Sequence, residues 1–295
     1  MTRRWPAEVN CKLTAGKVAL PTDKKMGAEI AFSFSAASKT MDDASSFDPR
    51  MQGWAVRPGR PANPRLVFYA LADGSFAVWD PARNYWRQGN DEGRERPSAY
   101  VFSPNEVWDG LQREDGVWLC NGLIRDWAGW QKENGRAFES LTAVLDVLSP
   151  SADERIVPGA LTRISLDDVR DMPTLKMPYG QEVPVVHASS GMRRIISLAY
   201  FLVWCWEEHV KAKALLGEEP DSKTVFLVDE VESHLHPKWQ RTVIPALMRV
   251  MNTLLSTSDV QLLAVTHSPL IMASVEPFFD RTQDAWFDFD LIDSR

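Results

Sequence analysis

Two adjacent carboxylates, Asp229 and Glu230, directly follow four apolar residues at positions 225–228. A short unbroken apolar run is typical of a buried parallel strand, and open α/β sheets bind their ligands at the carboxyl ends of such strands. A carboxylate at that place can hold Mg²⁺, and a second one can orient or deprotonate the water that attacks a phosphate. The pair therefore predicts a metal-dependent phosphoryl-transfer site.

A second apolar run, at residues 260–265, ends in Thr266, His267, Ser268 and Pro269. We interpret it as another buried strand of the same sheet. Because the carboxyl ends of parallel strands meet at one sheet edge, His267 is expected beside the two carboxylates. The alternative interpretation is that His267 only caps the helix that follows.

A third polar group lies upstream, where Ser189, Ser190 and Gly191 precede a long apolar helix that includes residues 195–204. Hydroxyl groups, free backbone N–H groups and the positive end of the helix dipole together make an anion site. Both serines are also ordinary N-cap residues, so a structural interpretation stays open.

Five other polar residues near these groups have structural interpretations. Arg193 and Arg194 are expected to be solvated helix charges, although they could face a nucleotide held by a partner. Glu232 is expected to be a surface carboxylate rather than a second metal ligand. His234 and His236 stand two residues apart with no third ligand in view, which is poor evidence for zinc.

The order of these three groups resembles the ABC-type ATPases, over residues 183–274. Within them the chain is most similar to the soluble branch related to SMC, RecF and OLD-type proteins, often labelled AAA-family ATPase in bacteria. The His-Leu-His-Pro string at residues 234–237 resembles that branch rather than the transporters. The resemblance implies a signature loop in which Ser189, Ser190 and Gly191 contact the γ-phosphate of a nucleotide held by a partner subunit.

The same resemblance assigns roles to the two strand ends. It implies that Asp229 is the Walker B residue that binds magnesium, that Glu230 is the general base, and that His267 is the switch histidine that senses the γ-phosphate. ATP and Mg²⁺ would then be the cofactors.

One expected motif is missing from the sequence. No Gly-x-x-x-x-Gly-Lys-Ser/Thr loop occurs, although that Walker A loop cradles the phosphates and shares the Mg²⁺. Residues 11–18 come nearest, but Cys11 replaces the first glycine, Val18 cannot bind magnesium, and Pro21 would interrupt the following helix. In relatives the motif lies near the amino terminus. The resemblance therefore implies a chain that begins after it: a fragment, a misassigned start or a split subunit.

The predicted fold is α/β, with a P-loop NTPase-type parallel sheet, flanking helices, an antiparallel β lobe and a helical insertion, and without the Walker A strand. We place the β lobe at residues 1–102, the helical insertion at 103–173 and the α/β core at 174–295. An Asp73-Gly74 turn predicts a hairpin in the first region. Strands are predicted at 28–34, 66–70, 76–79, 224–228, 260–265 and 285–292, with a hairpin over 175–186.

Helices are predicted from the spacing of apolar residues and from their flanking residues. Trp127 and Trp130 are three residues apart, which favours core packing over base stacking. The predicted helices cover residues 105–111, 123–132, 136–148 and 237–254, besides the apolar helix after Gly191.

The composition narrows the partners. A net charge of −7 and a pI of 5.4 disfavour a general nucleic-acid surface, although a DNA or nuclease partner stays open. Three widely spaced cysteines fit a reducing compartment. No signal peptide is visible, because Arg3 and Arg4 are followed by polar residues, and the apolar run at residues 195–206 is too short to span a bilayer. We therefore expect a cytoplasmic protein without a membrane partner.

Three functions are compatible with these residues. The first is ATP binding and hydrolysis, with activity that needs an upstream segment, a homodimer or a partner ATPase subunit to supply Walker A. The second is a non-catalytic module that docks its signature face on a partner bearing Walker A. The third, a transporter's nucleotide subunit, is disfavoured by His236 and Pro237.

Overall fold

The structure is a computed structural model of the 295-residue chain. It describes residues 65–84, 99–255 and 259–287 in full, and only the backbone of residues 2–3, 29–36, 39–48 and 53–54. The chain divides into two compact units, residues 3–63 and residues 64–295 with 1–2.

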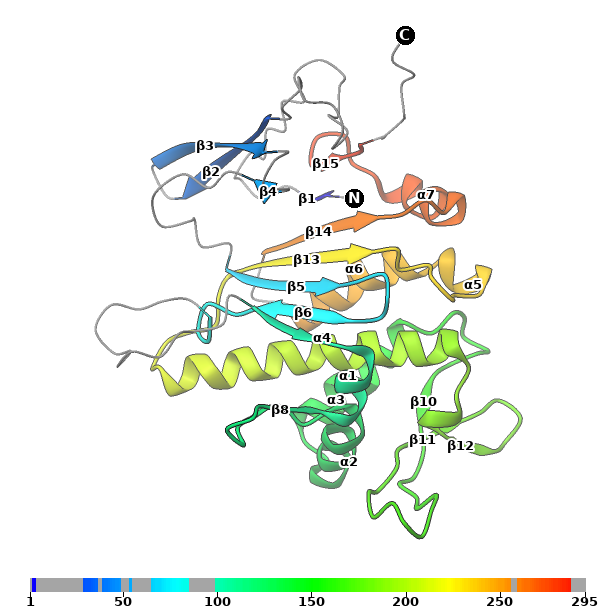
Figure 1. The fold of residues 1–295 in the computed structure, drawn as a ribbon. Coiled ribbons are helices and arrows are strands. Elements are labelled where there is room, and N and C mark those ends of the chain that lie inside the picture. Colours follow the sequence, from blue (N-terminus) through cyan, green and yellow to red (C-terminus); the bar gives the residue numbers. More distant parts are fainter. Residues whose placement is uncertain are drawn as a thin grey trace. The chain divides into compact units, whose positions relative to one another are not determined.

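A five-stranded sheet forms the centre of the larger unit, in the order β14-β13-β5-β6-β7 (Figure 1). Strands β14, β13 and β5 are parallel to one another, and β6 and β7 continue the sheet in antiparallel pairing. The predicted α/β class with a parallel sheet is thereby confirmed. The strands are β5 (Leu66–Ala70), β6 (Phe76–Trp79), β7 (Tyr100–Phe102), β13 (Lys223–Asp229) and β14 (Asp259–Val265).

The hairpin predicted around Asp73 and Gly74 is confirmed, and Gly74 has a φ of 92° at its turn. Its strands β5 and β6 belong to the central sheet, where β5 pairs in parallel with β13. The hairpin signal is local, whereas the partner of β5 lies more than 150 residues away in the sequence. The division into regions 1–102, 103–173 and 174–295 stays a prediction.

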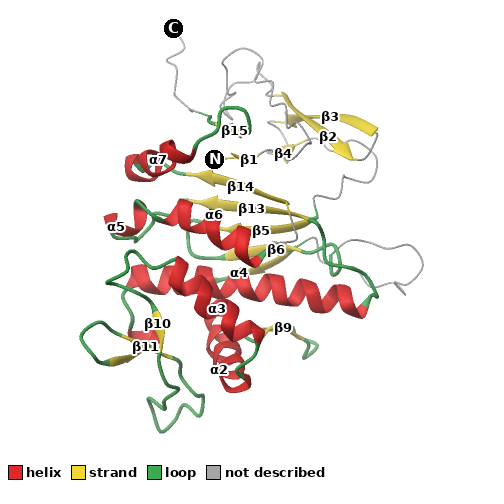
Figure 2. Ribbon diagram, turned by 180° about the vertical axis from the view of Figure 1, so that it is seen from behind, coloured by secondary structure: helices red, strands yellow, loops and turns green. Residues whose placement is uncertain are grey.

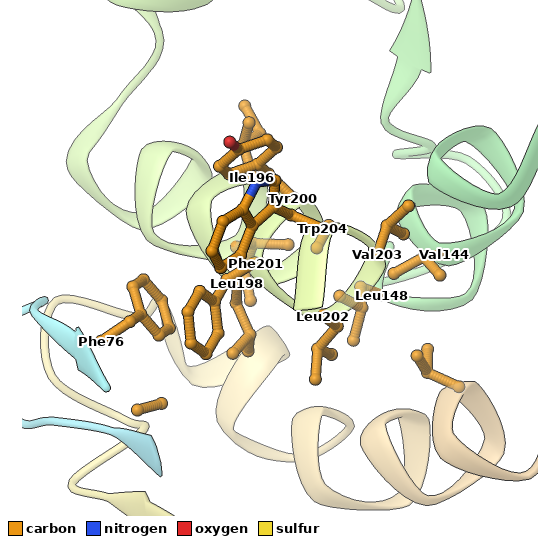
Figure 3. Close-up of a cluster of buried hydrophobic side chains, with 14 of the residues drawn as sticks. Phe76, Val144, Leu148, Ile196, Leu198, Tyr200, Phe201, Leu202, Val203 and Trp204 are labelled. Atoms are coloured by element: carbon orange, nitrogen blue, oxygen red, sulfur yellow. The ribbon is translucent and has the colours of Figure 1, made fainter. Parts of the chain in front are cut away.

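Helix α4 (Ser190–Leu215) is the longest helix among the described residues, and its middle, residues 195–206, is buried on all sides. Phe201 stacks on Phe76 of the sheet with ring centroids 4.3 Å apart. Elsewhere on the helix, Val203 lies toward Val144 and Leu148 at the end of α3 (Arg136–Val147; Figure 3). This double packing explains why the middle of the helix is apolar all round rather than along one stripe.

The far end of α4 is anchored by a buried histidine. His209 is fully buried, and its Nδ1 lies 2.9 Å from Asp80 Oδ1. The backbone N–H of Asp221 donates to His209 Nε2 at 3.0 Å, so Nδ1 carries the proton and donates to Asp80. These contacts join the helix to the segments that follow β6 and precede β13.

The three helices predicted within residues 103–173 are present as α1 (Pro104–Asp109), α2 (Leu123–Glu133) and α3 (Arg136–Val147), with a short β8 (Leu111–Gln112) and β9 (Trp118–Cys120). All three helices lie within two residues of their predicted bounds. Trp127 and Trp130 are buried, as expected for core residues.

Buried polar contacts attach this insertion to α4. The Trp108 indole donates to Ser197 Oγ at 2.9 Å, and the Tyr200 hydroxyl donates to Asp126 Oδ2 at 2.7 Å.

Burial raises the pKa of the Cys120 thiol to about 11, so this cysteine is not a reactive nucleophile.

The single helix predicted over residues 237–254 is wrong. The chain forms α5 (Pro237–Gln240) and then α6 (Val243–Leu254), which crosses in front of the sheet in Figure 2. Pro245 explains the break, because its ring clashes with the carbonyl four residues earlier, at Arg241, and it has no N–H to donate. In α6 the proline falls in the first turn, where neither property matters.

The segments on either side of α4 and β14 complete the larger unit. The hairpin predicted over residues 175–186 is confirmed as β11 (Thr174–Lys176) and β12 (Glu182–Pro184), followed by η2 (Val185–His187). Most of the strand predicted at 285–292, from residue 288 onward, lies outside the described residues. The other elements are β10 (Val157–Pro158), α7 (Pro269–Val275), η3 (Glu276–Phe278) and β15 (Asp284–Ala285).

The smaller unit contains an antiparallel sheet of β2 (Glu29–Ala36), β3 (Lys39–Asp48) and β4 (Gly53–Trp54); β1 is Thr2–Arg3. The strand predicted near residues 28–34 is confirmed. Strand β3 was not predicted, because its sequence lacks the alternation of apolar and polar residues. Residues 11–18, which were rejected as a Walker A loop, lie outside the described residues.

None of the described helices is both long and apolar enough to cross a bilayer.

Candidate functional site

Two chain segments leave the sheet side by side at the carboxyl ends of β13 and β14. Asp229 is in register with Val265, and the Glu230 N–H continues the pairing by donating to the Val265 carbonyl at 3.0 Å. The parallel arrangement thus delivers both carboxylates and the Thr266–His267 turn to one edge, which Figure 1 shows at the arrowheads of the two strands.

Glu230 and His267 approach each other at this edge. His267 Nδ1 lies 3.6 Å from Glu230 Oε1, which is longer than a hydrogen bond but within the range of an ion pair when the ring is protonated. Both side chains are accessible, with 41% of Glu230 and 77% of His267 exposed. The expectation that these residues share a sheet edge is met, while their catalytic roles stay predictions.

The backbone after β13 is held in an uncommon conformation. Glu230 has a φ of 43° and His234 a φ of 65°, in the left-handed region that non-glycine residues seldom adopt. Such conformations cost about 1–3 kcal/mol each and gather at functional sites, where the surrounding structure enforces them. The turn therefore fixes the direction in which the Glu230 carboxylate leaves the strand.

Asp229 influences a neighbour on the adjacent strand. Burial, and then the negative charges of Asp229 and Asp73, raise the pKa of the Tyr69 hydroxyl above its usual value. Tyr69 is paired with Leu227 in the register of β5 and β13, two residues before Asp229. Asp229 and Tyr69 thus lie on one face of the sheet at its carboxyl edge.

Glu232 is buried, and the expectation of a surface carboxylate is wrong. Only 8% of its side chain is exposed. Its Oε1 accepts hydrogen bonds from the Thr266 hydroxyl at 2.5 Å and from the His267 N–H at 3.2 Å. Its Oε2 is buried without a hydrogen-bond partner among the described residues. Its sequence neighbourhood gave a weak signal, since Val231 and Leu235 on either side are apolar and buried.

Ser189 and Ser190 are exposed at the start of α4. Ser189 is the N-cap residue, and its Oγ accepts from the Met192 N–H at 3.3 Å. Gly191 is buried, and a Cβ at this position would lie 3.0 Å from the His234 carbonyl oxygen. The predicted signature loop therefore packs through Gly191 against the loop that follows Glu230.

The two arginines after Gly191 have different surroundings. Arg193 is exposed, as expected, with its guanidinium 4.7 Å from the centroid of the Trp108 ring. The expectation of solvation is wrong for Arg194, which is partly buried and donates from Nη2 to the Leu71 carbonyl at 2.6 Å. Burial lowers the pKa of this guanidinium. Arg194 thereby ties the start of α4 to the β5–β6 turn.

We expect Gly191→Val to destabilise the protein by about 1–3 kcal/mol, because the added methyl groups must displace the His234 backbone. The free energy of unfolding in urea measures the effect. Ser190→Ala is the matched control; its side chain is exposed, so it should change stability by less than about 0.5 kcal/mol. Equal stability of the valine variant and the wild type would contradict the close packing of Gly191.

Among the described residues, no group of three His, Cys, Asp or Glu side chains is placed to hold a metal ion. The Asp229–Glu230 pair has the donor chemistry for magnesium, which is usually bound through one or two carboxylates together with substrate phosphates.

Comparison with known proteins gives one match over most of the chain. The model of the family described as "AAA domain, putative AbiEii toxin, Type IV TA system" matches residues 3–273.

Curated relatives match over shorter segments. The chain is 29% identical over 113 residues to the "Retron Vc95 probable ATPase" of Vibrio cholerae serotype O1 biovar El Tor, which is 38% of this chain and 20% of that protein. It is 30% identical over 66 residues to the "Retron Ec83 probable ATPase" of Escherichia coli, or 22% of this chain and 10% of that protein. The matches span a fifth or less of these relatives.

Solved structures of SMC heads are also similar. The SMC head domain from Thermotoga maritima has a TM-score of 0.33 at 11% identity, over 85% of this chain and 68% of that one. A structure titled "Structural biochemistry of ATP-driven dimerization and DNA stimulated activation of SMC ATPases" has a TM-score of 0.33 at 13% identity, over 50% of this chain and 77% of that one.

Proposed function

The chain belongs to this AAA-domain family, and on that basis we propose that it is an ATPase domain of the ABC type that binds and hydrolyses ATP. The observation that carries the proposal is the approach of His267 Nδ1 to Glu230 Oε1, 3.6 Å apart at the ends of adjacent parallel strands. Two polar groups from segments 37 residues apart converge where open α/β sheets bind ligands.

In this proposal each strand-end residue has one task. Glu230 accepts a proton from the attacking water, and the fixed backbone of its turn aims the carboxylate. His267 donates a hydrogen bond to the γ-phosphate, for which its 77% exposure leaves the ring accessible. Asp229 holds Mg²⁺, which when bound neutralises charge on the β- and γ-phosphates.

The start of α4 supplies the second half of the proposed site. Ser189 and Ser190 are exposed at the amino terminus of a 26-residue helix, where hydroxyls, N–H groups and the helix dipole favour an anion. We propose that these serines and Gly191 contact the γ-phosphate of a nucleotide held by a second subunit. Such a site needs a homodimer or a partner ATPase subunit, and a DNA or nuclease partner is compatible with it.

The sequence contains no Walker A loop, so the proposed site also needs a phosphate cradle from a partner or from a segment outside these residues. The missing Walker A loop also fits a second candidate function. In it, the chain is a non-catalytic module that docks the start of α4, with Ser189, on a subunit that bears Walker A. The two functions differ in whether ATP hydrolysis depends on Glu230. In an assembly that contains the chain, the first function requires Glu230 for hydrolysis and the second does not.

We expect the purified chain alone to bind ATP with a Kd weaker than about 1 mM, a binding free energy weaker than about −4 kcal/mol. The reason is the missing cradle of backbone N–H groups and lysine. Isothermal titration calorimetry with MgATP measures the affinity. Lys17→Ala is the control, because residues 11–18 are rejected as the cradle and the variant should give the same isotherm. Micromolar binding that this variant abolishes would overturn the rejection.

A further inference from the structure

Glu232 lies in the loop after β13 and has no role in the proposed reaction. It is more than nine-tenths buried, although carboxylates are almost never fully buried unless they are paired. No Lys or Arg ion pair with Glu232 occurs in the part of the chain that the structure describes. Its hydrogen bonds instead go to a single turn, Thr266–His267, at the end of the neighbouring strand.

These hydrogen bonds form a short chain that fixes the turn. The Ser268 N–H donates to Thr266 Oγ1 at 3.0 Å, and the Thr266 hydroxyl in turn donates to Glu232 Oε1. The His267 N–H donates to the same oxygen. One carboxylate oxygen therefore holds the backbone on both sides of the His267 Cα. It thereby fixes the position from which the imidazole side chain extends.

One ring nitrogen of the imidazole lies near two carboxylates. His267 Nδ1 is 3.6 Å from Glu230 Oε1 and 3.9 Å from Glu232 Oε1. Neither distance is a hydrogen bond, so the ring is held near Glu230 by its backbone rather than by a side-chain contact.

We propose that Glu232 is the positioning residue for His267: it couples the loop after β13 to the turn after β14 and holds the imidazole beside Glu230. The role of this positioning in hydrolysis rests on the proposed function. The hydrogen bonds that position His267 are present without nucleotide. It also gives a reason for the burial of this carboxylate between the exposed strand-end residues Glu230 and His267.

Hydrogen exchange of the His267 amide in the purified chain tests the positioning. Loss of a hydrogen bond to a charged group should accelerate exchange by about 10- to 100-fold in Glu232→Ala. Thr266→Val should also accelerate exchange of the His267 amide, because it removes the hydroxyl that bridges the Ser268 N–H to Glu232. Glu232→Gln and Thr266→Ser keep the acceptor and the hydroxyl, so both should exchange within about threefold of the wild type.

Controls and kinetics complete the experiment. Glu139→Ala and Thr253→Val change an exposed glutamate and an exposed threonine on α3 and α6, and should leave His267 exchange unchanged. The double variant of Glu232 and Thr266 should be no faster than Glu232→Ala alone, because the two residues act through one hydrogen-bond chain. In an assembly that hydrolyses ATP, Glu232→Ala should lower kcat at constant KM for ATP, and Glu232→Gln should restore it.

Unchanged His267 exchange in Glu232→Ala would overturn the proposal, whatever the ATPase activity. Faster exchange in a protein that shows no ATPase activity in any assembly would leave the positioning intact and refute the proposed function instead.

Discussion

Glu230→Gln is expected to lower kcat for ATP hydrolysis by about 10²- to 10⁴-fold, the usual contribution of a general base. Glutamine keeps the size of the side chain and the left-handed backbone of the turn, so only the proton-accepting oxygen is lost. Steady-state phosphate release, measured in an assembly that includes a phosphate-binding loop, gives the effect.

Nucleotide binding by the same assembly should persist in Glu230→Gln, and the nucleotide-bound, associated state should accumulate because hydrolysis no longer ends it. Glu276→Gln, an exposed carboxylate just after α7, is the matched control and should hydrolyse ATP like the wild type. If Glu230→Gln hydrolyses ATP normally, Glu230 is not the base.

Phe68→Ala should reduce the free energy of unfolding by about 3–5 kcal/mol, the range for deleting a buried aromatic side chain. Phe68 lies on β5, in register with Phe226 of β13, and is fully buried. Its ring meets those of Phe201 and Phe226 edge to face, with centroids 6.4 Å and 6.3 Å away. The cavity would therefore open where the helix packs on the sheet.

Urea unfolding measures this loss. Phe278→Ala is the control: that side chain is 66% exposed, so the change should stay within about 0.5 kcal/mol. A loss below about 1 kcal/mol in Phe68→Ala would mean that the core closes around the deleted ring or that the three rings do not pack as described.

The features that the sequence predicted are those with a local cause. An apolar run that ends in Asp229 and Glu230 identifies a buried strand, and a second run that ends in His267 identifies another. The rule that parallel strands share a ligand-binding edge then brings the two ends together. Ser189 could likewise be recognised as an N-cap from its neighbours alone.

The features that were missed depend on distant partners. The burial of Glu232 follows from Thr266, 34 residues further along the chain, and Arg194 is drawn inward by the carbonyl of Leu71. Strand β3 has no alternating pattern and depends on its pairing with β2. Pro245 is the exception, because the break between α5 and α6 has a local cause that the apolar periodicity concealed.

Helix α4 has a mechanical consequence. At about 1.5 Å per residue its 26 residues form a rod of about 39 Å. Near one end of the helix, Arg194 binds the β5–β6 turn, and near the other end His209 binds Asp80. With both ends attached, the helix cannot rotate independently of the sheet. A displacement of the exposed serines at the start of the helix would therefore be transmitted to the central sheet through these two contacts.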